Sequence, residues 1–186
     1  YFKGERADYL QEERQVALHE VDLLVRSTSE IVGQLHGITQ VLARDGNTER
    51  LLIRWNDTTE AVGGYSDSRM TGWERDKALV SLNSTLTSVT NSFRADVLWI
   101  VDANGYCVAS SDAGTAESFV GKNFSERDYF LQARAGVEGQ QFALGRISKV
   151  SGLYYSAPVV DDDGRFIGAV VAKTEVGNLY ERMNSA

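Results

Sequence analysis

The spacing of apolar residues changes once along this chain, near residue 95, from a helical period to a strand period. Upstream of that point, residues 6–55 contain no proline, and glycine occurs only at Gly33, Gly37 and Gly46. Downstream, short runs of β-branched and aromatic residues alternate with turn sequences. These two patterns predict an α+β fold in which long helices precede a sheet.

In the N-terminal helix, apolar or small residues recur at alternating steps of four and three, the repeat of a coiled coil. The stripe consists of Ala17, Val21, Leu24, Thr28, Ile31, Leu35, Ile38 and Leu42. It suits either the core of the helix's own domain or the seam of a dimer, and the sequence leaves both interpretations open. The segment Asp45-Gly46-Asn47 interrupts the stripe, so we expect the helix to end or kink there. Residues 51–55 are expected to add one more helical turn.

A second amphipathic helix is expected within residues 73–93, after a loop at residues 63–68. The sheet follows, with strands expected at residues 97–101, 106–110, 141–147, 154–160 and 166–174 and a helix at residues 127–135. Asn104-Gly105 and the segment 161–164 supply the residues of tight turns. This order predicts a five-stranded antiparallel sheet with a helical connection on one face.

Composition excludes several classes of function. The net charge of −7 argues against nucleic acid as a partner, because phosphate binding needs a basic face. A single cysteine, Cys107, excludes an internal disulfide framework and a cysteine-rich zinc site. His19 and His36 lack the spacing of metal ligands on a helix, and no glycine-rich phosphate loop occurs. We therefore expect no metal, no cofactor and no enzymatic activity in this chain.

The chain also reads as part of a larger protein. It begins with Tyr1 rather than methionine, and it contains neither a signal-peptide pattern nor the run of about twenty apolar residues that a membrane helix needs.

Basic residues gather in the sheet half of this acidic chain. Four lie between residues 127 and 149, and Lys173 lies within or at the end of an otherwise apolar strand. Nearby hydroxyl groups belong to Tyr129, Ser148, Ser151, Tyr154, Tyr155 and Ser156. Cations and hydroxyls that converge on one sheet face suit a small carboxylate ligand. The competing interpretation is a set of solvated surface charges.

Several spaced motifs favour the ligand. They are Ser110-Ser111, SFVGKNF at 118–124, RDYF at 127–130, FALG at 142–145, GLYYSAP at 152–158 and GAVVAK at 168–173. In this order they resemble the Cache family of extracytoplasmic sensor domains, which have a PAS-like fold. The similarity is greatest to the membrane-distal module of C4-dicarboxylate sensor histidine kinases. The resemblance covers residues 96–175 well and the N-terminal helix more loosely.

The resemblance implies a set of ligand-binding residues, namely Arg127, Tyr129, Ser148, Tyr155 or Ser156, and Lys173. The sequence departs from the family pattern at Asp128 and Ser151, which replace prolines, and at Arg146, which replaces a threonine. Arg146 would add a second cation to the pocket, whereas Asp128 would point away from it. The expected ligand is a small organic anion such as a dicarboxylate or an amino acid.

The expected organisation has a signalling and dimerisation helix at 1–55, a loop and helix at 56–94, a PAS-like ligand-binding module at 95–176 and a connection to the membrane or a second module at 177–186. The expected function is a periplasmic ligand-sensing domain of a bacterial inner-membrane receptor, most readily a sensor histidine kinase, that dimerises through its N-terminal helix. The alternative is a ligand-free dimerisation domain of a diguanylate cyclase or chemoreceptor. A soluble periplasmic binding module is a further alternative.

Overall fold

The computed structural model describes residues 2–61, 76–93, 95–178 and 181. The helices are α1 (Phe2–Ala43), α2 (Gly46–Ala61), α4 (Lys77–Phe93) and α5 (Asp128–Arg134). The strands are β1 (Val97–Asp102), β2 (Cys107–Ser110), β3 (Gly139–Leu144), β4 (Ser151–Val160) and β5 (Phe166–Glu175). The loop expected at residues 63–68 and the helix start expected at residue 73 lie outside the described residues.

The five strands form one antiparallel sheet in the order β2-β1-β5-β4-β3. The last strand, β5, therefore lies at the centre, which explains why its sequence is almost continuously apolar. The expected α+β fold, with a long N-terminal helix and a five-stranded antiparallel sheet, is confirmed. Several strand boundaries differ from the expected ones. β3 begins two residues earlier and β4 three residues earlier, β2 begins one residue later, and β1 and β5 each end one residue later.

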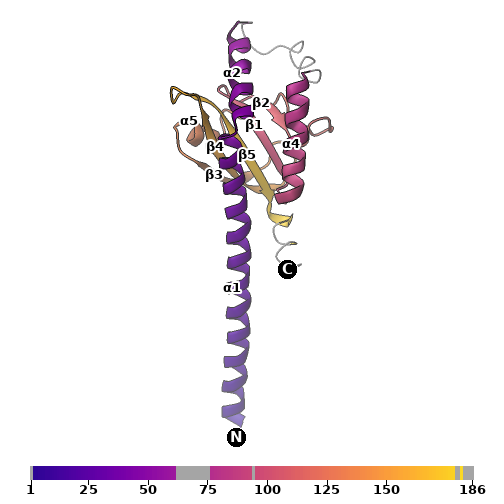
Figure 1. The fold of residues 1–186 in the computed structure, drawn as a ribbon. Helices are drawn as coiled ribbons and strands as arrows, with labels where there is room; N and C mark the ends of the chain where they lie inside the picture. Colours follow the sequence, from indigo (N-terminus) through magenta and orange to yellow (C-terminus); the bar gives the residue numbers. More distant parts are fainter. Residues whose placement is uncertain (1, 62–75, 94, 179–180, 182–186) are drawn as a thin grey trace.

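Helices cover both faces of the sheet (Figure 1). On one face, α1, α2 and α4 form a core with inward residues such as Leu35, Leu52, Leu86 and Val170. On the other face, α5 and the loop before it enclose an aromatic core with Trp99 at its centre. The second face also holds Tyr129, Ser156 and Lys173, three of the residues that the sequence proposes as a ligand site.

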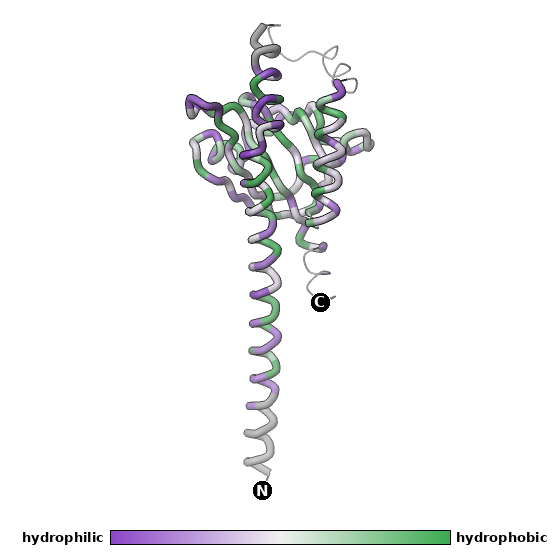
Figure 2. The backbone as a smooth tube through the Cα atoms, viewed as in Figure 1, coloured by the Kyte–Doolittle hydropathy of each residue, from purple (hydrophilic) through white to green (hydrophobic). Residues whose placement is uncertain are grey.

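The two halves of α1 have different surroundings. Near its C-terminal end, Leu35, Ile38 and Leu42 are buried against the sheet, so this part of the stripe is core. Towards the N-terminus the helix extends away from the module, and Val21 and Leu24 are exposed. Figure 2 shows apolar and polar residues alternating along this free part. The C-terminal part of the stripe therefore packs in the core of the helix's own domain. Its N-terminal part is not covered by any of the described residues.

Asp45 separates α1 from α2. Its carboxylate accepts hydrogen bonds from the backbone N–H groups of Asn47 (3.0 Å) and Thr48 (3.2 Å), which is the role of a helix N-cap. The interruption expected at Asp45-Gly46-Asn47 is thus present. The single additional turn expected at residues 51–55 is wrong, because the capped helix continues to Ala61.

The strand expected at residues 141–147 ends early, at Leu144. The Gly145 N–H donates to the Val150 carbonyl (2.9 Å), and the Lys149 N–H donates back to the Gly145 carbonyl (3.1 Å). Lys149 completes this turn with a φ of 57°, in the left-handed region. The turn replaces the last three residues of the expected strand and carries Ser148 towards the sheet.

Candidate functional site

Lys173 is a buried cation near the end of β5. Its side chain is 1% exposed, and its Nζ donates to the Ser148 Oγ (2.7 Å) and to a carboxylate oxygen of Glu175 (2.6 Å). Gly152 lies beside it on β4, where a Cβ atom would come within 3.0 Å of the lysine Cε. An ammonium group this deep requires an anion and hydrogen-bond acceptors around it. The buried ammonium therefore favours a negatively charged group at this end of the sheet.

Arg127 approaches the same face from α5. It is the N-cap residue of that helix, and its guanidinium carbon lies 5.4 Å from the centroid of the Tyr154 ring and 5.8 Å from that of Tyr129. The two tyrosine rings are stacked, with centroids 5.3 Å apart and an angle of 10° between their planes. A guanidinium at this distance from two rings is held by cation–π attraction while it keeps its N–H donors for other partners. One of these donates weakly to the Leu144 carbonyl (3.4 Å).

The hydroxyl of Tyr129 is buried, and within the described part of the chain it has no hydrogen-bond partner. Burial raises the pKa of Tyr129, against the opposing effect of the nearby Arg127 charge, so the phenol is neutral and can donate. A buried hydroxyl without a partner is unfavourable and uncommon in native proteins. The ring of Tyr129 also lies beside the Arg127 guanidinium, so an unpaired hydroxyl donor and a cation are close together here.

Tyr154 connects the two cations. It pairs with Lys173 in the β4–β5 register, so both side chains lie on the face that α5 covers, and its ring also contacts Arg127. Gly145 packs closely here, since a Cβ atom would lie 2.4 Å from the Ser148 Oγ and 3.2 Å from the Tyr154 hydroxyl. Arg127, Tyr129, Ser148 and Lys173 thus gather around Tyr154.

Tyr154 was named only among the hydroxyls near the basic residues, and neither Tyr154 nor Glu175 was in the set of ligand-binding residues that the resemblance implied. Strand alternation relative to Lys173 could have indicated Tyr154 if the register had been known.

The other predicted residues have different surroundings. Tyr155 lies on the opposite face of the sheet, where its ring contacts His36 of α1 with centroids 6.4 Å apart. Ser156 lies on the α5 face, but its hydroxyl donates to the Tyr129 carbonyl (2.7 Å) and so attaches β4 to α5. The structure does not bring either hydroxyl into the group around Tyr154.

The two substituted positions next to the site make contacts of their own. Arg146 is half exposed, pairs with Glu126 and donates to the Asn123 carbonyl (3.0 Å), which ties the turn after β3 to the loop before α5. Asp128 is exposed and accepts a hydrogen bond from the Gln141 side chain (3.0 Å). Arg146 therefore has a carboxylate partner already, and Asp128 is directed to β3.

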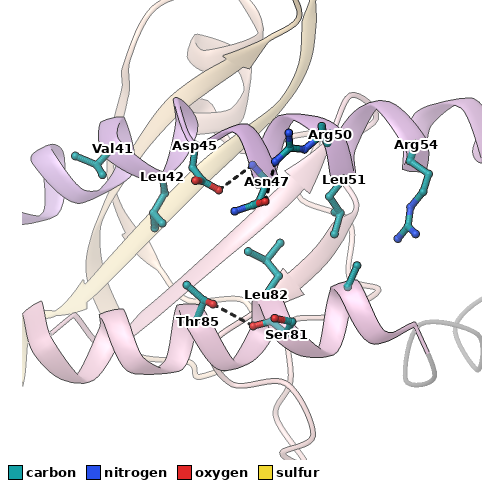
Figure 3. Close-up of a pocket in the computed structure, with 11 residues that line it drawn as sticks. Val41, Leu42, Asp45, Asn47, Arg50, Leu51, Arg54, Ser81, Leu82 and Thr85 are labelled. Atoms are coloured by element: carbon teal, nitrogen blue, oxygen red, sulfur yellow. Dashed lines mark hydrogen bonds between the residues drawn. The ribbon is translucent and has the colours of Figure 1, made fainter.

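A separate cavity of about 560 Å³ lies on the opposite face, between α4 and the junction of α1 with α2 (Figure 3). Its apolar lining includes Leu42, Leu51 and Leu82. Its two arginines have protein partners, since Arg50 donates to Asn47 (3.0 Å) and Arg54 to Asp76 (2.7 Å). It shares no residue with the group around Tyr154.

Comparisons with known proteins find sensor proteins that are similar in fold and in sequence. The sensor domain of the Vibrio cholerae histidine kinase DctB superimposes with a TM-score of 0.71 and 23% identity, over 90% of this chain and 57% of that one. The chain has the fold of a sensor domain. Two C4-dicarboxylate transport sensor proteins DctB are also similar in sequence. The protein of Rhizobium meliloti is 37% identical over 98 residues, and that of Pseudomonas aeruginosa is 28% identical over 130 residues.

The similar regions are 53% and 69% of this chain but only 16% and 21% of these two relatives. No protein-family model matches the chain. The similarities confirm the resemblance to sensor domains of C4-dicarboxylate sensor kinases that the motifs indicated.

Proposed function

We propose that this chain is the periplasmic ligand-sensing domain of a membrane-bound sensor histidine kinase and that it binds a small carboxylate between Arg127 and Lys173. Both cations reach the same face of the sheet, and Tyr154 lies against both. A guanidinium and an ammonium on the same sheet face can both give charge-assisted hydrogen bonds to carboxylate oxygens. The relatives, whose names include C4-dicarboxylate, support a dicarboxylate as the first candidate.

The observation that carries this proposal is the buried Tyr129 hydroxyl, which has no partner among the described residues. A carboxylate oxygen of the ligand would accept its hydrogen bond and that of Arg127 together. This accounts for a polar atom that would otherwise lower the stability of the fold. In a site that no longer bound a ligand, this hydroxyl would stay buried without a hydrogen-bond partner, which is unfavourable.

The shape of the chain supports a position next to a membrane. The free part of α1 and the end of β5 point to the same side of the module (Figure 1). Segments that continue from both could therefore reach one membrane surface. Within the described part of the chain, none of the helices has the apolar stretch that a membrane span requires.

The free part of α1 supports a dimer. Leu18, Val21 and Val25 are 52%, 55% and 58% exposed, and every residue from 13 to 26 is exposed to solvent. An isolated helix with apolar residues at this spacing buries them by pairing with a second helix. We propose a parallel homodimer through this part of α1, by which ligand binding to the sheet would be transmitted as a shift between the two helices.

Calorimetric titration of the purified chain tests the ligand proposal, with succinate, fumarate, acetate and L-aspartate as probes. Replacing Arg127→Ala should lower the affinity for the bound probe by about 2–5 kcal/mol, at least about thirtyfold, because a charged partner of the carboxylate is lost. The free energy of unfolding should change by about 1 kcal/mol or less, since the residue contributes mainly a cation–π contact.

Arg134→Ala is the matched control, because Arg134 is an exposed arginine in the last turn of the same helix. It should bind like the wild type. Equal affinities of the Arg127 variant and the wild type would remove Arg127 from the site. A wild-type chain that binds none of the four probes but still dimerises would favour a structural dimerisation domain instead.

A further inference from the structure

We propose that Glu175 is a tethered carboxylate that competes with the ligand for Lys173 and so sets the affinity of the site. The inference rests on the proposed binding of a carboxylate. Lys173 already holds an anion in the structure, since its Nζ lies 2.6 Å from a Glu175 carboxylate oxygen. A ligand carboxylate that arrives at this ammonium therefore meets an occupied position.

The two partners differ in their access to water. The Lys173 side chain is 1% exposed, whereas that of Glu175 is 24% exposed. The Lys173 ammonium cannot exchange its present contacts for water. The Glu175 carboxylate can rotate into solvent and be hydrated there, so it can leave the lysine at a small free-energy cost. Exchange of Glu175 for a ligand carboxylate therefore requires the glutamate to move and leaves the lysine in place.

The backbone around Glu175 allows this exchange without rearranging the sheet. The Glu175 N–H donates to a carboxylate oxygen of Asp96 (2.5 Å), and the Asn178 side chain donates to the other (2.8 Å). These contacts hold the end of β5 independently of the Glu175 side chain. Rotation about the side-chain bonds of Glu175 alone would then free Lys173.

The charge count explains why Glu175 would lower affinity. When a ligand binds, one Lys173 ion pair is replaced by another, or two carboxylates share the ammonium and repel each other. In both cases the ligand gains less than it would from a lysine without a carboxylate. Glu175 also supplies Lys173 with its anion in the ligand-free state, which lets a fully buried cation exist there.

Calorimetric titration with succinate compares the wild type with Glu175→Gln, which keeps the size of the side chain and removes its charge. We expect the variant to bind succinate at least about tenfold more tightly, because the competing charge is gone. Asp162→Asn is the control. It removes the same charge from the exposed turn that precedes β5, at the other end of that strand, and should leave the affinity unchanged.

Thermal unfolding provides a second measurement. Without succinate, the Glu175→Gln variant should unfold at a lower temperature than the wild type, because Lys173 is buried without an anion. Saturating succinate should then raise the melting temperature of the variant more than that of the wild type.

Equal or weaker binding by the Glu175→Gln variant, with binding by the wild type intact, would overturn the role of Glu175 and leave the proposed function standing. Binding by the variant alone would support the role of Glu175. Absence of binding by both, to succinate and to the other three probes, would overturn the proposed function itself.

Discussion

Asp102 is a fully buried carboxylic acid at the end of β1. One of its oxygens accepts hydrogen bonds from the backbone N–H groups of Asn104 and Tyr106, both at 2.9 Å, and so shapes the turn between β1 and β2. Burial raises its pKa from 3.8 to about 6, and the backbone hydrogen bonds oppose the increase only in part. The residue therefore organises a hairpin at the cost of carrying an unfavourable charge at neutral pH.

This cost predicts a pH dependence of stability. Between pH 4 and pH 6 the folded chain retains a proton on Asp102 that the unfolded chain has released, so stability contributed by this residue falls as pH rises. A change of about two pKa units corresponds to about 3 kcal/mol. In Asp102→Asn, which keeps the oxygen that accepts both backbone N–H groups, this component should be absent. Urea unfolding of both proteins from pH 3.5 to pH 7 measures it. The raised pKa of Asp102 would be contradicted if the free energies of unfolding of the two proteins changed equally with pH. It would also be contradicted if the wild type became more stable relative to the variant as pH rises.

Among the elements, the contact of β3 with α5 and β4 depends on Gly139. A Cβ atom at this position would lie 2.3 Å from both the Ser156 Oγ and the Tyr129 carbonyl oxygen. These two atoms are themselves joined by the hydrogen bond that attaches β4 to α5. The adjacent Glu138 pairs with His36 and accepts a hydrogen bond from Gln40 (2.5 Å), both on α1. One short segment thus contacts both the helix that carries Arg127 and Tyr129 and the long helix on the other face.

We therefore expect Gly139→Ala to lower the free energy of unfolding by about 1–3 kcal/mol, the usual cost of excess volume at a packed position. It should also weaken binding of the carboxylate probe, because α5 must move away from β3. Urea unfolding and calorimetric titration measure the two effects. Gly37→Ala is the control, since a Cβ atom there meets no atom within 4 Å and alanine favours the helix by up to about 1 kcal/mol. If Gly139→Ala were as stable as the wild type and bound the probe equally well, the close packing at Gly139 would have no such role.

The type and order of the elements followed from periodicity and turn residues, because both are local properties. The contacts that build the site did not. Composition grouped Ser148 with five other hydroxyls, and only the family resemblance selected it for the site. It reaches Lys173 through a turn that replaces the end of a predicted strand. Tyr154 and Tyr155 are adjacent and chemically alike, and only the pairing with β5 decides which one faces the cations. The Glu175–Lys173 ion pair depends on side-chain geometry at the end of a strand, which composition does not determine.

At the scale of the whole molecule, one apolar stripe serves two purposes. Where α1 crosses the sheet, the stripe is buried in the module, with Leu35 at 1% exposure. Beyond the module the same stripe continues into solvent through residues 13–26, a length of about 20 Å. A shift of the exposed part therefore requires a matching shift where α1 packs on β4 and β5. If the proposed ligand and dimer are correct, this continuity would connect the sheet to the paired helices.

The dimer proposal predicts which positions of α1 meet their copies. Val21 and Leu24 occupy the seam of the repeat, whereas His19 and Arg26 lie on the outer face of the same helix. Single cysteines at Val21 and Leu24 in the membrane-bound parent protein should form crosslinks between subunits much faster than cysteines at His19 and Arg26. The membrane raises the effective concentration of the two helices, so the full-length protein is the appropriate sample.

Cys107 can remain in place in this experiment, because it is buried and burial raises the pKa of its thiol, which keeps it unreactive. The stripe near the module is not expected to crosslink, since Leu35 lies in the core. If the signal is a shift between the helices, adding the carboxylate that binds in calorimetry should change the rate of crosslinking at Val21 relative to that at Leu24. Equal rates at the seam and at the outer face would mean that the exposed stripe of α1 does not pair with its copy, and the route from the sheet to the membrane would then have to run through the end of β5.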